Sequence, residues 1–169
     1  MRILALDLGT HTGWALLDGE VTTSGTWHLA KPAEVTKQKA DGLDRCCDMR
    51  PARLLKHIES MGPLSLIAFE DVQFLSTQLQ AQLWASLRAI VTLQYPAVKL
   101  LAVPVGTLKK AATGFGNAKK EHMAAALIKS APETYKPHAS GKVLKPDGSL
   151  ADDNEVDAIH LLSYARNKH

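Results

Sequence analysis

The stretch that decides the fold is RILALDLGTHTGWAL, from Arg2 to Leu16. It begins with an apolar run, Ile3 to Leu6, which ends at the carboxylate of Asp7. The small residues between Gly9 and Gly13 suit a tight turn, and a second apolar run, Trp14 to Leu17, follows at once. Short apolar runs bounded by turn residues are typical of buried strands. The stretch therefore predicts a β-hairpin with Asp7 in or just beyond its first strand.

A carboxylate at this central position requires a partner. Burying a charge is costly unless the group is paired, hydrogen-bonded or bound to a metal ion. Asp7 could accept backbone N–H bonds within the turn, or it could ligate a metal ion. The hairpin alone does not decide between these roles, so the rest of the chain must be searched for further acids.

The composition is that of one globular domain, which we expect to cover residues 1–169. The chain is 46% hydrophobic and 22% charged, with a net charge of +3, and its length allows a sizeable core. We find neither an apolar stretch long enough to cross a membrane nor a signal peptide. The neighbours Cys46 and Cys47 suit neither a zinc site nor an unstrained disulfide. Free thiols fit a reducing compartment, so we expect a cytoplasmic protein.

Downstream of the hairpin, predicted strands alternate with predicted helices. Helical periodicity covers residues 34–60, where Pro51 predicts a kink or two helices. Residues 131–150, rich in Pro, Gly, Ser and Lys, predict a flexible loop with a turn at Pro146-Asp147-Gly148. The other strands are expected at residues 20–29, 64–69 and 98–103, and the other helices at 77–95, 105–112, 118–130 and 152–167. This order predicts a mixed α/β sheet flanked by helices.

Carboxylates occur at three places near the ends of these elements. Asp7 ends the first strand, and Glu70 and Asp71 end the strand at residues 64–69. The sequence ADDNEVDA, residues 151–158, opens the last helix. Acids at the ends of neighbouring strands can converge with acids from a helix on one point.

The acidic segment at the start of the last helix allows two interpretations. Asp153 and Asp157 are four residues apart, and Asn154 and Asp157 three apart, so each pair shares a helical face. Acids also favour a helix N-terminus, and capping or solvation is the better interpretation for Asp152. It is the weaker one for Asp157, which has apolar neighbours in the sequence.

Several carboxylates at one point repel one another, and some must take up protons unless a cation compensates them. Ligand sets made only of oxygen select Mg²⁺ or Mn²⁺ over zinc. Two such ions roughly 4 Å apart form the clamp that nucleases use for in-line displacement at phosphorus. The acids therefore indicate a metal-dependent nuclease.

Four stretches of the chain carry a family resemblance. They are ILALDLGTHTGWAL, LIAFEDV, VPVGTLKKAATGFGNAKKEHM and DDNEVDAIHLLSYA. In this order, and across nearly the whole chain, they resemble the RuvC branch of the RNase H-like superfamily, in particular phage- and prophage-type Holliday junction resolvases. The resemblance implies an RNase H-like fold and a Mg²⁺-dependent endonuclease, with Mn²⁺ able to substitute. Its implied substrate is branched DNA, such as the four-way junctions of recombination and repair, cut by two-metal-ion phosphodiester hydrolysis.

The resemblance also implies roles for individual acids. The family's catalytic, metal-binding acids fall on Asp7, Glu70 and Asp157. A fourth ligand comes from Asp153 or Asn154. The family usually has Asp or His three residues before the last acid, where this chain has the neutral amide of Asn154. Asp153 is the alternative ligand for that reason.

Basic residues support a nucleic-acid partner. In the family, the equivalents of Lys109 and Lys120 lie beside the scissile phosphate, which gives Lys120 a catalytic role. Lys110 and Lys119 complete two lysine pairs that flank a Gly-x-Gly loop. Lysines near phosphates supply salt-dependent affinity and neutralise charge in the transition state. A solvated surface is the alternative role for all four.

The aromatic residues and one histidine have simpler interpretations. In related resolvases an aromatic residue after the second central strand stacks on a base at the junction. Phe74 lies one residue from that place, so packing is an equal alternative. We interpret Trp14, Trp27 and Trp84 as core residues, and His160 as a packed histidine.

Three other functions are compatible with parts of the sequence. The glycine hairpin also resembles that of actin-like ATPases and sugar kinases, which need two such lobes. The segment MRILALDLGTHTG resembles YqgF-type ribosomal RNA processing nucleases, which would keep the fold and change the substrate to RNA. The third is a DNA-binding relative without catalysis, against which the presence of Asp7, Glu70 and Asp157 argues.

Symmetry predicts the assembly. A four-way junction has two-fold symmetry, and two symmetric nicks need two active sites, so a C2 homodimer is expected. The long helix at residues 77–95 is the predicted interface.

Overall fold

The centre of the molecule is a five-stranded mixed sheet. The computed structural model describes residues 1–31, 33–34, 48–72 and 77–168. The strands are β1 (Arg2–Asp7), β2 (His11–Asp18), β3 (Val21–His28), β4 (Leu66–Asp71) and β5 (Lys99–Pro104). Their order is β3-β2-β1-β4-β5, antiparallel from β3 to β1 and parallel from β1 to β5. The predicted mixed sheet is confirmed, with strand ends within three residues of those expected.

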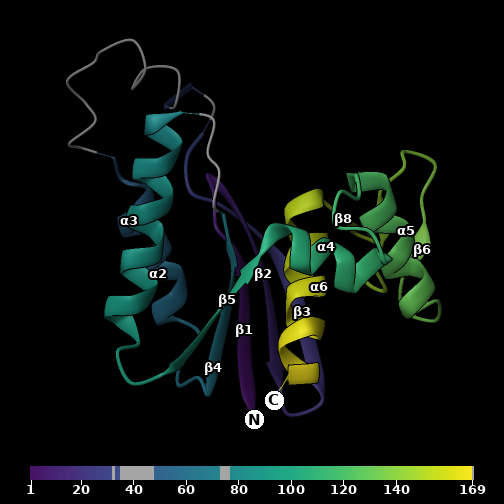
Figure 1. Cartoon of the computed structure of the whole chain (residues 1–169), viewed down its shortest axis with the longest axis horizontal. Helices are drawn as coiled ribbons and strands as arrows, with labels where there is room; N and C mark the ends of the chain where they lie inside the picture. The colour runs from purple at the N-terminus through teal and green to yellow at the C-terminus, as the bar shows by residue number, and fades with distance from the viewer. Residues whose placement is uncertain (32, 35–47, 73–76, 169) are drawn as a thin grey trace.

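Helices cover both faces of the sheet (Figure 1). The helices are α2 (Arg50–Glu59), α3 (Gln78–Gln94), α4 (Val105–Thr113), α5 (Lys120–Ser130) and α6 (Asp153–Lys168). Buried residues of α2 and α3 share one core cluster, and those of α4, α5 and α6 share the other. Within the described ranges, no helix is long and apolar enough to cross a membrane.

The alternation of side chains along the strands separates these two cores. In β1, Ile3 and Ala5 belong to the α6 side, whereas Leu4 and Leu6 belong to the α2 and α3 side. Successive residues of a strand point to opposite faces, and both faces of this strand are covered. This explains why the first apolar run is continuous rather than alternating.

Of the two outcomes expected at Pro51, a kink or two helices, the kink is not found, because a helix begins there. Pro51 lies in the first turn of α2, where a missing N–H group breaks no intrahelical hydrogen bond. Most of the helical pattern that precedes it falls on residues 35–47, which lie outside the described residues. Cys46 and Cys47 lie there too.

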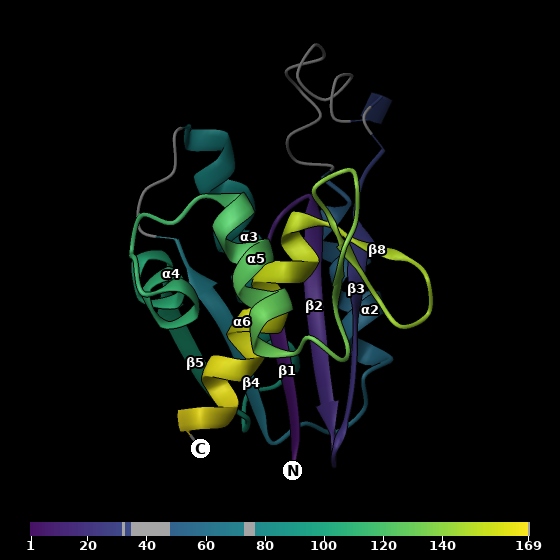
Figure 2. The same ribbon diagram turned by 90° about the vertical axis from the view of Figure 1, so that its right-hand side faces the viewer.

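The prediction of a flexible loop at residues 131–150 is corrected in part, because short strands interrupt its turns. This segment forms a second, three-stranded antiparallel sheet of β6 (Lys136–Pro137), β7 (Val143–Leu144) and β8 (Leu150–Ala151). The expected turn is present, because the N–H of Gly148 donates to the carbonyl of Lys145 at 3.0 Å. Val143 is fully buried in the α6-side core and anchors the segment. Figure 2 shows the segment leading directly into the start of α6.

Candidate active site

Strand register brings Asp7 and Glu70 together. β1 and β4 pair in parallel with Ala5 opposite Ala68, and both alanines lie in the α6-side core. Asp7 and Glu70 each follow two residues later, so they stand side by side on the same face of the sheet. Both lie at the carboxyl ends of their strands.

Asp157 comes to the same point from α6, which packs across β1 and β2 on that face. Burial, followed by the negative charges of Glu70 and Asp157, raises the pKa of Asp7 well above its ordinary value. Burial and the charge of Asp157 raise the pKa of Glu70 to about 7. Burial also raises the pKa of Asp157 to about 6. Such shifts are the signature of carboxylates that share one partly dehydrated site.

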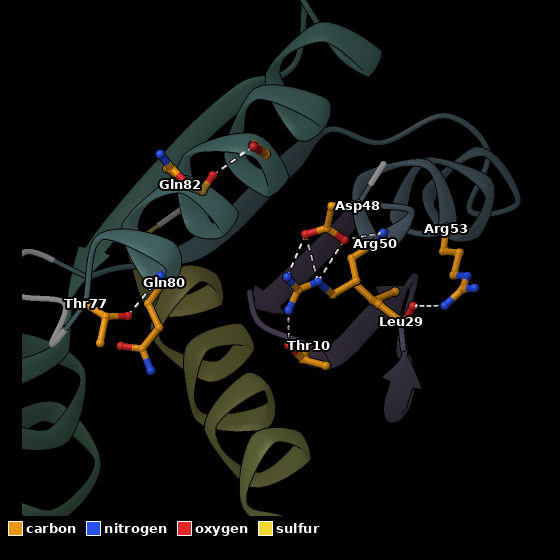
Figure 3. A network of polar contacts seen from close by, with 9 residues as sticks. Thr10, Leu29, Asp48, Arg50, Arg53, Thr77, Gln80 and Gln82 are labelled. Atoms are coloured by element: carbon orange, nitrogen blue, oxygen red, sulfur yellow. Dashed lines mark hydrogen bonds and ion pairs between the residues drawn. The ribbon is translucent and has the colours of Figure 1, made fainter. Parts of the chain in front are cut away.

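The turn after β1 does not rely on Asp7. The hydroxyl of Thr12 donates to the carbonyl of Gly9 at 2.8 Å, and the N–H of Gly9 donates back at 3.4 Å. Thr10 is bound from outside by Arg50, whose guanidinium lies 2.8 Å from the Thr10 hydroxyl and also pairs with Asp48 (Figure 3). The turn therefore has its own supports, which leaves the Asp7 carboxylate available to a ligand.

Gly13 has a different role from the one expected. It lies inside β2 rather than in the turn, opposite Asp7. A Cβ atom on Gly13 would lie 1.9 Å from the backbone oxygen of Asn154 and 2.9 Å from the backbone nitrogen of Glu155. The first turn of α6 thus rests directly on the backbone of β2, which only glycine permits. This contact sets how closely α6 approaches the sheet.

Two acids at the start of α6 anchor the helix. Asp152 accepts hydrogen bonds from the N–H of Glu155 at 2.9 Å and from the Thr26 hydroxyl at 2.7 Å, which confirms the capping interpretation. Glu155 is 3% exposed, and accepts from the Ser24 hydroxyl at 2.7 Å and from Lys145 at 2.9 Å. The sequence analysis missed Glu155, since its partners lie in β3 and in the segment interpreted as a loop.

Lys109 and Lys120 are the lysines whose charges act on these carboxylates. The positive charge of Lys109 lowers the pKa of Glu70 and Asp157, although burial outweighs it. Lys120 acts in the same way on Asp7, and its amine lies 2.7 Å from Asp153. Lys110 and Lys119, next to them in the sequence, are exposed.

The donor set suits a hard divalent cation. Its members Asp7, Glu70 and Asp157 offer only oxygen, and their mutual repulsion is what a divalent cation relieves. The carboxylates do not form a closed ligand shell: across the described residues, no three His, Cys, Asp or Glu side chains are grouped closely enough to hold an ion. Ion binding would therefore require these side chains to draw together.

Asp153 and Asn154 are the two candidates for the fourth ligand, and a different observation bears on each. The negative charge of Asp153 raises the pKa of Asp157, so Asp153 lies close enough to act on the acids. Asn154 is placed by its backbone, which contacts the position of Gly13. The assignment of the ligand stays a prediction.

The remaining site residues have mixed outcomes. Phe74 lies outside the described residues. Trp27 is buried, and Trp14 and Trp84 are partly buried against the same core. His160 is buried, and its Nε2 lies 2.9 Å from the carbonyl of Met123. The core role of the tryptophans and the packing role of His160 are confirmed.

Solved structures with similar folds include RuvC and a Holliday junction resolvase. RuvC of Thermus thermophilus is 18% identical, with 99% of this chain and 97% of that chain covered and a TM-score of 0.60. This chain has the fold of RuvC. T. thermophilus RuvC in complex with a Holliday junction substrate gives 19% identity, coverage of 99% and 96%, and a TM-score of 0.62. The yeast mitochondrial Holliday junction resolvase Ydc2 gives 11% identity, coverage of 99% and 84%, and a TM-score of 0.51.

These likenesses confirm the predicted RuvC-like, RNase H-like fold. No family model matches the sequence, and no curated protein matches it. The similarity to RuvC is therefore one of fold, with coverage of nearly the whole of both chains.

Proposed function

We propose that this protein is a divalent-metal-dependent endonuclease that cleaves branched DNA, as a Holliday junction resolvase does. The observation that carries the proposal is the convergence of Asp7, Glu70 and Asp157, with raised pKa values, at the ends of two parallel strands. Lys109 and Lys120 act on the same carboxylates. Branched DNA is favoured because RuvC of the same fold has been solved with a Holliday junction substrate.

Asp7, Glu70 and Asp157 are the proposed ligands of Mg²⁺ or Mn²⁺, with Asp153 or Asn154 as the fourth. When bound, such ions supply an activated water and stabilise the leaving oxygen of the phosphodiester. Glu70 must be ionised to act as a ligand, and its pKa of about 7 means that a proton competes for the site near neutral pH.

The lysines bind the phosphate backbone in this proposal. The side chain of Lys120 is 73% exposed, so it can leave Asp153 for a phosphate at little cost, because an exposed ion pair contributes little stability. Lys109 is half-buried next to Glu70 and Asp157 and holds positive charge at the acids themselves. Lys110 and Lys119 extend the basic surface, and Phe74 is proposed to contact a base.

Cleavage assays test the proposal. The substrates are a four-way DNA junction, a linear duplex, a flap and a structured RNA, each incubated with Mg²⁺ or Mn²⁺. We expect paired, symmetric nicks in the junction, and their loss in Asp7→Asn. Lys120→Met should retain metal binding but cleave the junction at least tenfold more slowly, as expected when a charge-stabilising group is lost.

Asp18→Asn is the matched control, because Asp18 ends β2 and pairs with Arg2, at the end of the sheet away from Asp7. This variant should cleave as wild type does. Cleavage of RNA alone would transfer the assignment to the processing nucleases. Junction binding without cleavage in either metal would reduce the protein to a DNA-binding module.

A further inference from the structure

Phe115 is an exposed aromatic side chain with no role in the proposed site. Its side chain is 70% exposed. The large hydrophobic residues exposed in the described ranges include no other aromatic residue; the others are Met1, Val21, Met49, Leu79, Leu93 and Leu150. Aromatic side chains usually contribute to a core or an interface, so an exposed one that belongs to neither core cluster needs a partner.

The backbone holds Phe115 in place. Gly114 ends α4 with φ +88°, and its N–H donates to the carbonyl of Lys110 at 2.9 Å. The hydroxyl of Thr113 accepts from the N–H of Phe115 at 3.1 Å, and the N–H of Ala118 donates to the carbonyl of Phe115 at 3.3 Å. The loop thus presents the ring from a fixed main chain, which lowers the entropy lost on binding.

Gly116, which follows Phe115 in the chain, makes a second close contact. A Cβ atom there would lie 3.3 Å from the carbonyl oxygen of Gly106, in the first turn of α4. The loop therefore folds back onto its own helix instead of extending into solvent. The two glycines that flank Phe115 serve this compact path.

The surroundings of Phe115 in the chain are basic. Residues 105–120 contain four lysines and no acid, and no Asp or Glu occurs between Asp71 and Glu121. The loop joins α4 to α5, the helices that bring Lys109 and Lys120 to the carboxylates. An aromatic ring among phosphate-binding lysines is the combination that proteins use to hold unpaired bases.

We propose that Phe115 stacks on an unpaired or unstacked base of the DNA substrate, next to the branch point. This inference rests on the proposed function and names a positioning residue within it. Lys109 and Lys120 bind the phosphates on either side, and the ring takes the face of a base that the branch leaves open. A continuous duplex offers no such face, because its bases are already stacked. Phe115 therefore favours branched over linear DNA.

Equilibrium binding with Ca²⁺ in place of Mg²⁺ tests this role. The substrates are a four-way junction with 2-aminopurine at positions flanking the crossover, and a linear duplex of the same length. Phe115→Ala should weaken junction binding about tenfold, as expected for one lost stack, and should change duplex binding less than twofold. The fluorescence of 2-aminopurine should be higher in the complex with Phe115→Ala than in the complex with wild type, because the base loses a stacking partner. Phe115→Trp should behave as wild type.

Val21→Ala is the control for removing an exposed apolar side chain, since Val21 is 65% exposed and is the first residue of β3. The inference is overturned if Phe115→Ala binds the junction with wild-type affinity and fluorescence while wild type still cuts it, which leaves the proposed function standing. It is also overturned if junction and duplex binding fall equally. If wild type neither binds nor cuts the junction, the proposed function fails and this inference fails with it.

Discussion

Burial raises the pKa of Glu70, one of the proposed metal ligands. Its pKa of about 7 results first from burial and then from the charge of Asp157. In the unfolded chain the carboxyl has its ordinary pKa of 4.5. Between these two values the folded state binds a proton that the unfolded state has lost. The free energy of unfolding of the metal-free protein therefore falls as pH rises through this window.

Glu70→Gln removes this titration. Without divalent metal, we expect the variant to gain stability relative to wild type between pH 4.5 and pH 8, by on the order of 2 kcal/mol. This corresponds to a relative rise in Tm of roughly 4–8 °C. Thermal unfolding at several pH values in EDTA measures it.

Glu59→Gln is the control for this series, because Glu59 is an exposed residue at the end of α2. Its stability should follow that of wild type at every pH. Mg²⁺ at pH 8 should stabilise wild type and leave Glu70→Gln almost unchanged, since the amide is a poorer ligand. Parallel pH profiles for Glu70→Gln and wild type would show that Glu70 is not buried as described.

Single residues were predictable from the sequence where local pattern decides their place. Asp7 and Glu70 directly follow apolar runs, so the ends of their strands locate them. Asp157 stands out because apolar residues surround it. Glu155 was not predictable, because its partner Lys145 comes from a segment whose strands are two residues long. Patterns of that length carry no periodic signal.

At the scale of elements, the contact between α6 and β2 sets the geometry of the site. The backbone of Asn154 occupies the space that a side chain at position 13 would fill. Since Asp153 and Asp157 lie on α6, their distance from Asp7 depends on this contact. A sequence motif rich in glycine suggests a turn first, and the close approach of a helix 140 residues further along the chain cannot be inferred from it.

Gly13→Ala should both destabilise the fold and displace α6. The added Cβ would lie 1.9 Å from a backbone oxygen, which cannot move without the helix. We expect a loss of about 2 kcal/mol or more, typical of severe overpacking, and a fall in Tm of roughly 4–8 °C. The rise in Tm that Mg²⁺ causes should also be smaller in this variant than in wild type.

Gly9→Ala is the matched control within the same hairpin. A Cβ atom at Gly9 would lie 3.5 Å from the nearest atom, the carbonyl oxygen of His11, which is an ordinary contact. Its Tm and its response to Mg²⁺ should stay close to those of wild type. If Gly13→Ala were as stable as Gly9→Ala, the close approach of α6 to β2 would be refuted.

At the scale of the whole molecule, the sheet separates the candidate site from the predicted dimer interface. The candidate site lies on the α6 side, whereas α2 and α3 cover the opposite face. Leu87 and Val91 of α3 are buried in that core, and Leu93, in its last turn, is 75% exposed. α3 thus exposes Leu93 on the side of the sheet away from the carboxylates, where a second copy would not disturb them. The predicted homodimer with α3 at its interface fits this division.

Leu93→Asp tests the dimer. In the predicted interface, a charge at position 93 meets its own copy or an apolar surface, so association should weaken by at least tenfold. Sedimentation velocity should show a dimer for wild type and a monomer for Leu93→Asp at the same micromolar concentration.

On a supercoiled plasmid with an extruded cruciform, wild type should give linear product through two coupled nicks, and Leu93→Asp should accumulate nicked circles. Val21→Asp changes an exposed residue at the start of β3, and this variant should remain dimeric and linearise the plasmid. A wild-type monomer that still linearises the plasmid would remove the need for a dimer, and a dimeric Leu93→Asp would place the interface elsewhere.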